Sequence, residues 1–354
     1  MNCRIRTFSM MNNERWNKDL NNTRNDLKRH EGDTCPLCDS DNKVIKSQIT
    51  YEAIWHELER ECKTVFSEEA VKRHTPCEFT TLVECENCGL QYFIPVVPGD
   101  SQFYGELSKS PSFYDQSKWE FDHVLKRLRP SDQVLDVGCG EGSFLSKIRS
   151  HVNGAIGIDT NPVAVRRAIA AGLDVRLTDI FSFSHLYDEM FDVVCCFHVI
   201  EHINKVIPFI RDALSCLKPD GLLVLSVPNR ERILCKPIEV LDCPPHHISR
   251  WSSDQLTKLG DMMGTKLATL VLEMADPSAS SEWLRNILFA KIRNHPLLTN
   301  FQPVYLYAKL FSRIVFISPL HHIYKRTNLL KRWRLYRLTM LAYYKKQYLT
   351  SNNP

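Results

Sequence analysis

The chain has 354 residues, of which 44% are hydrophobic, so it can form about two domains with buried cores. Residues 1–30 are polar and no uncharged apolar stretch of about 18 residues appears, which argues against secreted and membrane-spanning proteins. The net charge of +4 is uneven, because residues 281–354 contain 13 Lys and Arg but only one acidic residue, Glu282. We therefore expect a cytoplasmic protein whose 13 cysteines are thiols or metal ligands rather than disulfides.

Two pairs of cysteines in the N-terminal part have the spacing of metal ligands. Residues 1–30 are predicted to be disordered or loosely ordered, and residues 31–100 to form a small zinc-ribbon-like domain. Each C-x-x-C pair can offer two thiolates to one tetrahedral ion, and two pairs fill its coordination shell, which is typical of a structural site. The predicted ligands of a structural zinc are Cys35, Cys38, Cys85 and Cys88.

The segment between the two cysteine pairs is long for a ribbon. Residues 51–73 have apolar side chains at helical spacing, which predicts a helical insertion inside the ribbon. Cys62 and Cys77 are rival ligands, but neither has a partner at C-x-x-C spacing.

Aromatic residues are concentrated in the linker 99–118. Aromatic side chains in such a position pack between domains or stack on a substrate, and both alternatives stay open for Phe103 and Phe113. Tyr104 and Tyr114 are candidate contacts on the cofactor side. A helix is expected over residues 119–128.

A glycine-rich turn follows the first predicted strand of the next domain. The sequence Val134-Leu-Asp-Val-Gly-Cys-Gly-Glu-Gly142 is a short apolar run that ends in a turn with glycines at alternate positions. A dinucleotide fingerprint would need glycine at position 143, where this chain has Ser143. Two carboxylates, Asp136 and Glu141, favour a ligand with positive charge over a diphosphate.

Further strands and helices follow at regular intervals. An apolar run ends at Asp159, about 20 residues past the glycines, where an acidic residue can meet ribose hydroxyls. Asn161-Pro162 predicts the start of a helix, and residues 174–179 predict a third strand. The nearly unbroken apolar run 191–200 predicts a central parallel strand, followed by a helix over 203–217 and a fifth strand over 222–229. Pro208 is expected in the first turn of that helix.

Over residues 119–275 these motifs resemble the class I S-adenosylmethionine-dependent methyltransferases. The resemblance implies an α/β fold with a Rossmann-like, doubly wound, mostly parallel seven-stranded sheet, over a domain of residues 101–280. It also implies S-adenosyl-L-methionine as cofactor. The cofactor-binding residues implied by the resemblance and by the positions at the strand ends are Asp136, Gly138, Cys139, Gly140, Asp159, Thr160, Asp179, Ile180, Phe197 and His198.

The order of the two predicted domains is also informative. A zinc ribbon ahead of such a domain resembles bacterial sugar and natural-product methyltransferases, in which the second knuckle lies in a C-x-x-C-G-L setting. The sequence Cys88-Gly-Leu-Gln-Tyr-Phe-Ile-Pro95 matches that junction.

The sequence His198-Val-Ile-Glu201-His202 matches the H-x-x-E-H signature of inverted zincin peptidases. That zinc site needs both histidines on one face of a helix, whereas the preceding apolar run places His198 at the end of a strand. We therefore expect these residues to line the mouth of the cofactor and substrate site.

Methyl transfer to a hydroxyl or carbon acid needs a base, and histidine suits this role near neutral pH. The segment Pro244-Pro-His246-His247-Ile-Ser-Arg-Trp251 follows the fifth strand, and Ser252 to Gln255 predicts a capped helix. The predicted catalytic residues are His246 or His247, with His202 next. The alternative, that a histidine only packs or caps, must hold for at least one of the adjacent pair.

Residues 281–354 are predicted to form a basic helical region. A sixth strand is expected over 265–273 and a seventh over 338–345, which makes the region between them an insertion. This basic insertion could cap the acceptor, contact an anionic membrane peripherally or pack as core.

The sequence thus predicts methyl transfer from S-adenosylmethionine to an oxygen or carbon of a small-molecule or glycan acceptor, including nucleotide-linked and lipid-linked ones. The alternative is an RNA methyltransferase that holds RNA through the zinc ribbon and the basic region. Residues 197–199 lack the Asn/Asp-Pro-Pro-aromatic sequence used by many enzymes that methylate base nitrogens. A third alternative is a non-catalytic zinc-ribbon binding protein, against which the set Asp136, Gly138, Gly140, Asp159 and Asp179 argues.

Overall fold

The structure is a computed structural model that describes residues 33–110, 118–232, 240–273 and 339–346. The chain divides into two compact units, and the one described here comprises Met10–Leu272 and Thr339–Pro354. The other unit, Met1–Ser9 and Glu273–Leu338, lies outside the described residues except for Glu273. Three sets of predictions therefore fall on residues that the structure does not describe. They concern residues 1–30, the aromatic residues Phe113 and Tyr114, and the basic insertion before the last strand.

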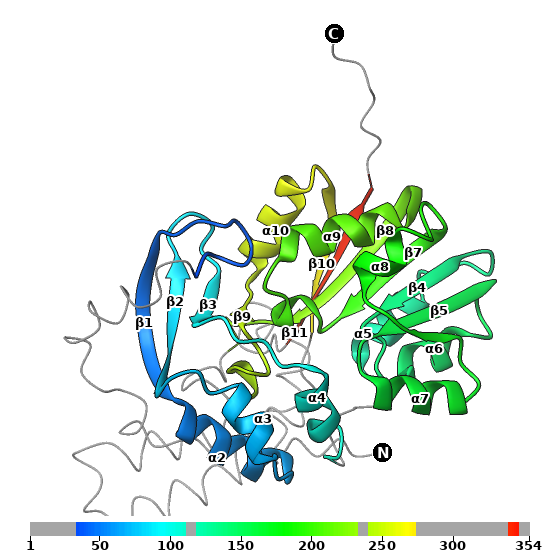
Figure 1. The fold of residues 1–354 in the computed structure, drawn as a ribbon. Helices are drawn as coiled ribbons and strands as arrows, with labels where there is room; N and C mark the ends of the chain where they lie inside the picture. Colours follow the sequence, from blue (N-terminus) through cyan, green and yellow to red (C-terminus); the bar gives the residue numbers. More distant parts are fainter. Residues whose placement is uncertain (1–32, 111–117, 233–239, 274–338, 347–354) are drawn as a thin grey trace, which may run out of the picture. The chain divides into compact units, whose positions relative to one another are not determined.

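The cysteine-containing part is built on a four-stranded antiparallel sheet with the order β1-β2-β3-β9 (Figure 1). Its strands are β1 (Lys43–Thr50), β2 (Phe79–Cys85), β3 (Gln91–Ile94) and β9 (Ser249–Arg250). The helices α2 (Tyr51–Cys62) and α3 (Glu68–Arg73) lie between β1 and β2. The predicted helical insertion in the ribbon is confirmed, and both helices begin at a side-chain cap, from Thr50 and Ser67 respectively.

A seven-stranded sheet of order β10-β11-β8-β7-β4-β5-β6 forms the second part, as predicted. Neighbouring strands from β8 to β6 are parallel, whereas β11 is antiparallel to both β8 and β10. The strand order reverses between β4 and β7, and ligands of such sheets bind at this switch point beyond the carboxyl ends. The strands are β4 (Gln133–Val137), β5 (Gly154–Asp159), β6 (Val175–Leu177), β7 (Phe191–Phe197), β8 (Leu217–Pro228), β10 (Lys266–Leu272) and β11 (Thr339–Lys345).

Both faces of this sheet are buried, which explains the apolar run in β7. Val194 and Cys196 belong to one core cluster, whereas Val193, Cys195 and Phe197 belong to another on the opposite face. The helices are α4 (Ser101–Leu107), α5 (Trp119–Leu125), α6 (Ser143–Ile148), α7 (Pro162–Ala170), α8 (Ile180–Ser184), α9 (Val206–Ser215) and α10 (Ser253–Met262), with the 3-10 turns η3 (Ile200–His202) and η5 (Val240–Asp242). No helix among the described residues is long and apolar enough to cross a membrane.

Most predicted elements are present, with one revision after β7. The helix expected over 203–217 is shorter than predicted, since α9 spans Val206–Ser215, and the 3-10 turn η3 precedes it. Pro208 then lies in the first turn of α9, where its missing N–H costs no helical hydrogen bond. The predicted cap of Asn161 on α7 and the capping box of Ser252 and Gln255 on α10 are both confirmed.

Candidate cofactor and acceptor site

The glycine turn between β4 and α6 lies at the switch point of the sheet. Gly138, Gly140 and Gly142 all have positive φ angles, of 73°, 54° and 79°, which other residues rarely adopt. A Cβ atom at Gly138 would lie 2.6 Å from Cγ2 of Val199, so only glycine allows the turn to approach the segment after β7. The turn is therefore packed directly on the residues that follow the central strand.

Three carboxyl groups lie at this turn, and one of them, Glu141, pairs with Arg167. Asp159 at the end of β5 accepts hydrogen bonds from the backbone N–H groups of Gly140 and Asn161, at 2.8 and 2.7 Å. Asp136 is buried in β4, and burial raises its pKa to about 8, with a further contribution from Asp159. Burial also raises the pKa of Asp159. A cationic ligand would lower the cost of ionising both groups.

The remaining predicted cofactor residues lie around the same strand ends. Thr160 and Asp179 are exposed, and the Asp179 side chain caps α8 by accepting from the backbone N–H of Ser182. Ile180 is buried in the first turn of α8. Cys139 is buried beside Gly157, and Phe197 packs edge-on against Phe121 and Phe144 in the core.

His198 follows β7 with a φ of 56°, an uncommon conformation for a residue other than glycine. Its Nε2 lies 2.9 Å from Oε1 of Glu120 in α5, and its Nδ1 lies 3.5 Å from Oε1 of Glu201. Burial and Lys118 oppose a charge on His198, but the two glutamates outweigh them and raise its pKa. His198 and His202 do not share a helix, so the peptidase arrangement is absent from this segment, which the structure describes in full.

The structure brings together the three histidines predicted from two distant segments. His202, in η3, and the adjacent His246 and His247 have ring centroids 4.3 to 5.0 Å apart. His202 is partly exposed, whereas the other two are buried. Burial lowers the pKa of His202 to about 4 and holds that of His246 well below its ordinary value, with nearby histidines adding to the effect. We call these three residues the histidine cluster.

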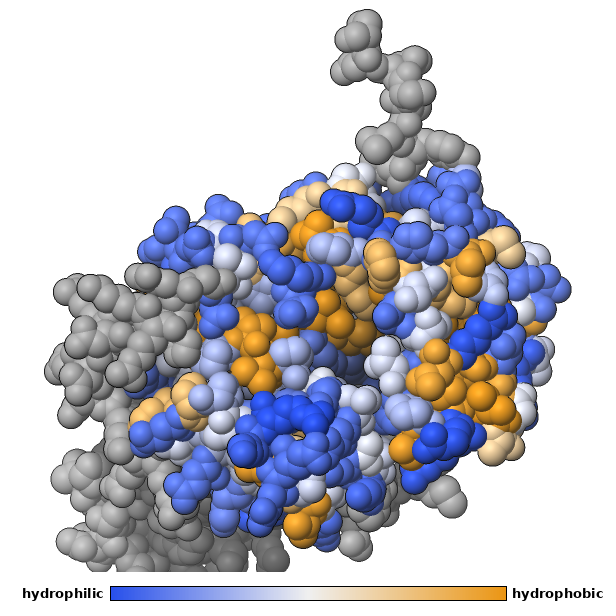
Figure 2. Space-filling model, viewed as in Figure 1, coloured by the Kyte–Doolittle hydropathy of each residue, from blue (hydrophilic) through white to orange (hydrophobic). Residues whose placement is uncertain are grey.

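Tyr104 of α4 completes this cluster. Its hydroxyl lies 2.8 Å from Nδ1 of His202 and donates to the backbone carbonyl of His246 at 3.1 Å. Tyr104 was predicted as a cofactor-side contact, and it contacts the candidate catalytic histidines. Figure 2 shows a hollow near the centre of the face that it displays, where polar and apolar residues meet.

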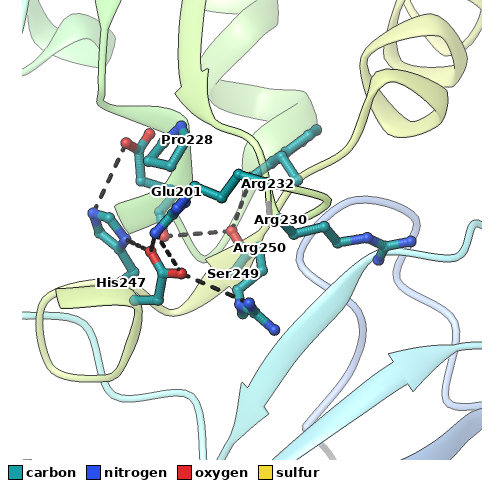
Figure 3. Close-up of a pocket in the computed structure, with 9 residues that line it drawn as sticks. Glu201, Pro228, Arg230, Arg232, His247, Ser249 and Arg250 are labelled. Carbon is teal, nitrogen blue, oxygen red and sulfur yellow. Dashed lines mark hydrogen bonds and ion pairs between the residues drawn. The ribbon is translucent and has the colours of Figure 1, made fainter. Parts of the chain in front are cut away.

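Acidic and basic residues that the sequence did not single out surround His247. A pocket of about 10 Å³ is lined by Glu201, His247, Asp242 and three arginines, among other residues (Figure 3). Asp242 accepts two hydrogen bonds of 2.8 Å from Arg232, and its Oδ1 lies 3.5 Å from Nδ1 of His247. Although burial opposes its charge, Arg232 and His247 hold the pKa of Asp242 far below its ordinary value. Neither Glu120 nor Asp242 belongs to a sequence motif. Only their position among apolar residues could have indicated that these two acids are buried at a functional site.

The four predicted cysteine ligands form one cluster. The Sγ atoms of Cys35 and Cys88 are 3.5 Å apart, as are those of Cys38 and Cys85, and all four lie within 4.8 Å of one another. A tetrahedral zinc with four thiolates has S–S separations of about 3.8 Å, so the donor set fits this ion. The hydrogen bond between the two thiols lowers the pKa of Cys88 and raises that of Cys35, so the pair holds a proton more readily on Cys35. The rival Cys62 and Cys77 are not members of the cluster.

A family model described as a methyltransferase domain matches residues 117–270. A ubiquinone biosynthesis O-methyltransferase of Actinobacillus pleuropneumoniae is 37% identical over 109 residues, which are 28% of this chain and 46% of that protein. A probable S-adenosylmethionine-dependent methyltransferase of Mycolicibacterium smegmatis is 30% identical over 161 residues, which are 44% of this chain and 62% of that protein. The chain thus spans only about half the length of the curated relatives that it matches.

Among solved structures, an S-adenosylmethionine-dependent methyltransferase of Archaeoglobus fulgidus aligns with a TM-score of 0.43 and 18% identity, over 64% of this chain and 94% of that one. The sheet order found here, with its antiparallel strand β11, is typical of Rossmann-like methyltransferases. From this sheet, the glycine turn and the match to the family model, we conclude that the chain contains a class I S-adenosylmethionine-dependent methyltransferase domain, preceded by a four-cysteine cluster.

Proposed function

We propose that this chain transfers the methyl group of S-adenosylmethionine to an oxygen or carbon of a small-molecule or glycan acceptor. The observation that carries the proposal is the packing of the segment after β7 on the glycine turn. Val199 packs against Gly138, and His202, three residues further along the chain, belongs to the histidine cluster. A site for a cationic cofactor and a group of proton acceptors thereby lie on adjoining segments. The O-methyltransferase named among the relatives supports an oxygen acceptor.

In this proposal the acidic residues at the strand ends bind the cofactor. Asp136 lies close enough to the turn to attract the positive charge of the methionine moiety, and Asp159 accepts from ribose hydroxyls as well as from the backbone. Thr160, Asp179 and Ile180 lie where the nucleoside would extend along the carboxyl ends of β5 and β6. The four cysteines hold a structural zinc that stabilises the sheet beside the site.

The acceptor side requires little chemistry beyond placement and removal of a proton. Methyl transfer is an in-line displacement at an activated sulfonium, so most of the rate depends on positioning the acceptor. The low pKa of His202 keeps its imidazole neutral near neutral pH, so one of its ring nitrogens has a lone pair that can face the acceptor. Asp242 beside His247 can orient that ring and stabilise a positive charge on it. We assign the acceptor side to the cluster of His202, His246 and His247.

Isothermal titration with S-adenosylmethionine tests the cofactor half of the proposal. We expect one binding site per chain, and a loss of about tenfold or more in affinity for Asp159→Ala, because a ribose contact of two hydrogen bonds is removed. Asp174→Ala, an exposed acid just before β6, is the matched control. Absence of heat with the parent protein, or equal affinity for Asp159→Ala, contradicts the proposal.

A labelled-methyl assay on fractionated cell extract tests the acceptor half. We expect the label to enter small-molecule, glycan or lipid-linked pools. Label in RNA, together with salt-sensitive retention of the chain on RNA but not on anionic vesicles, would instead support an RNA methyltransferase.

A further inference from the structure

The histidine cluster has the composition of a metal site as well as that of a general base. One nitrogen from each of His202, His246 and His247 can be chosen so that all three lie within 4.8 Å of one another. Three imidazoles around one ion at N–metal distances of about 2.1 Å have nitrogens about 3.4 Å apart, so the rings need to close by about 1.5 Å or less. Such a movement is within the reach of side-chain rotation.

The hydrogen bonds around His202 leave one ring nitrogen free to bind. Its Nδ1 lies 2.5 Å from the backbone carbonyl oxygen of His246, and a carbonyl oxygen can only accept. Nδ1 therefore carries the proton, and Nε2 keeps its lone pair. Metal-bound histidines commonly donate their other N–H to a backbone carbonyl in this way.

The surroundings of His247 follow the same pattern. Its Nδ1 faces the carboxylate of Asp242 at 3.5 Å, and the Arg232 guanidinium keeps that carboxylate ionised. A proton on Nδ1 satisfies this contact and leaves the lone pair on Nε2. The arrangement is that of a carboxylate–histidine–metal triad, in which the carboxylate fixes the tautomer of the ligand.

Glu201 supplies a carboxylate next to the three rings. It is buried, neither of its oxygens makes a hydrogen bond within the described part of the chain, and Oε1 lies 3.9 Å from Nε2 of His247 (Figure 3). A buried carboxylate oxygen that faces an imidazole lone pair is unfavourable unless a cation lies between them. The adjoining pocket of about 10 Å³ has room for about one ion or water. The Nδ1 atom of His198, at 3.5 Å from Oε1, neutralises part of the charge of Glu201.

We propose that His202, His246 and His247, with Glu201 as the neighbouring carboxylate, bind one divalent transition-metal ion that is separate from the ion at the four cysteines. Imidazole and carboxylate donors suit Co²⁺, Ni²⁺, Zn²⁺ and Fe²⁺. Such an ion can keep a position for an oxygen donor of the acceptor, which would deepen the proposed function. The binding itself does not depend on methyl transfer.

Cobalt titration of the full chain, isolated with zinc in its four-cysteine site, tests this proposal. We expect one equivalent of Co²⁺ to bind with the weak visible bands of nitrogen and oxygen ligands, without the intense sulfur-to-metal bands of a cysteine site. His247→Ala and His202→Ala should each lower the Co²⁺ affinity at least tenfold, whereas His151→Ala, at an exposed turn, should not change it. Circular dichroism of each variant tests whether it is folded.

Thermal unfolding provides a second measurement on the unaltered chain. Ni²⁺ at a concentration well above its dissociation constant should raise the melting temperature of the parent chain and of His151→Ala, but not that of His247→Ala. Binding of no Co²⁺ beyond the cysteine site, or equal binding by folded His202→Ala and His247→Ala, overturns the proposal. The cation between Glu201 and His247 would then be a proton. S-adenosylmethionine binding and methyl transfer would still be measurable, so this failure is distinguishable from a failure of the proposed function.

Discussion

At the scale of single residues, the buried carboxyl of Asp136 links protein stability to pH. The folded chain keeps the Asp136 proton up to about pH 8, because burial raises its pKa from an ordinary value of 3.8. The unfolded chain loses the same proton near pH 4, so the stability that this residue contributes is fully present below that pH and is lost as the pH rises to about 8. The protein therefore carries a destabilising buried acid beside the glycine turn above neutral pH.

We predict that Asp136→Asn becomes more stable relative to the parent chain as the pH rises. Asparagine has nearly the same shape but cannot ionise, so the difference should grow by about 3–4 kcal/mol between pH 5 and pH 8. Urea denaturation of the cofactor-free proteins at several pH values measures it, with the exposed Asp174→Asn as control. A difference that stays constant over this range would show that Asp136 does not titrate there.

Asp242 differs from Asp136, because its buried carboxylate has positively charged neighbours that keep it ionised. Its carboxylate contacts Arg232 at 2.8 Å, His247 at 3.5 Å and Arg250 at 3.7 Å. Asp242→Asn leaves the guanidinium groups of Arg232 and Arg250 without this counter-charge, and we predict a loss of about 3–5 kcal/mol in the free energy of unfolding. Urea denaturation at pH 7 measures it. The exposed pair of Asp174 and Arg176, at 3.9 Å, supplies the control Asp174→Asn, which should cost below about 1 kcal/mol. Equal losses in the two variants would contradict the prediction.

At the scale of elements, the glycine turn can contact the segment after β7 because Gly138 has no side chain. Alanine there would have a φ of 73° and a Cβ 2.6 Å from Cγ2 of Val199. Gly172 has a similar φ of 75°, but a Cβ at that position would meet nothing within 4 Å. Alanine at Gly172 would therefore show the effect of backbone strain alone, whereas alanine at Gly138 would add steric overlap with Val199.

We predict that Gly138→Ala weakens S-adenosylmethionine binding and destabilises the chain by more than Gly172→Ala. The Gly172 variant should cost about 1–2 kcal/mol, from the left-handed backbone alone. The double variant Gly138→Ala with Val199→Ala removes the overlap and should recover part of the lost affinity, but not the strain. Titration calorimetry and urea denaturation measure the two effects. Absence of any recovery in the folded double variant would mean that Val199 does not transmit the effect.

Elements whose signals are local could be predicted from the sequence, and elements that depend on a distant partner could not. Asn161-Pro162 and Ser252 to Gln255 carry their own caps, and both helices begin where predicted. The two-residue strand β9 has no periodicity of its own and exists because it pairs with β3, more than 150 residues earlier.

The same distinction applies to the candidate site. The cysteine cluster follows from two short spacings, whereas the grouping of His202 with His246 depends on contacts across 44 residues. The later start of the helix after β7 also involves a tertiary contact, since the backbone N–H of Val206 at the start of α9 donates to the carbonyl of Pro36.

At the scale of the whole described unit, the cysteine sheet and the histidine cluster share a backbone connection. The strand β9 pairs with β3 of the cysteine sheet and directly follows the segment that carries His246 and His247. The backbone N–H of Phe93 donates to the carbonyl of Ile248, and that of Ile248 to the carbonyl of Glu201. The side chains of Gln255 and Lys258 both donate to the carbonyl of Cys88. Order at the four cysteines is therefore coupled to order at the histidine cluster.

We predict that disruption of the four-cysteine cluster, where we propose a structural zinc, also weakens the methyltransferase part. Cys85→Ser removes one thiolate from the cluster, and the melting temperature of the chain should fall by about 5 °C or more in a single transition, because the two parts share β9. Amide hydrogen exchange should accelerate at Phe93 and also at Ile248, which belongs to the histidine segment. Cys62→Ser is the control, since Cys62 lies outside the cluster and its substitution should leave metal binding by the cluster unchanged. Faster exchange at Phe93 with an unchanged rate at Ile248 would show that the cysteine sheet loses order on its own, and that the four-cysteine cluster does not support the histidine segment.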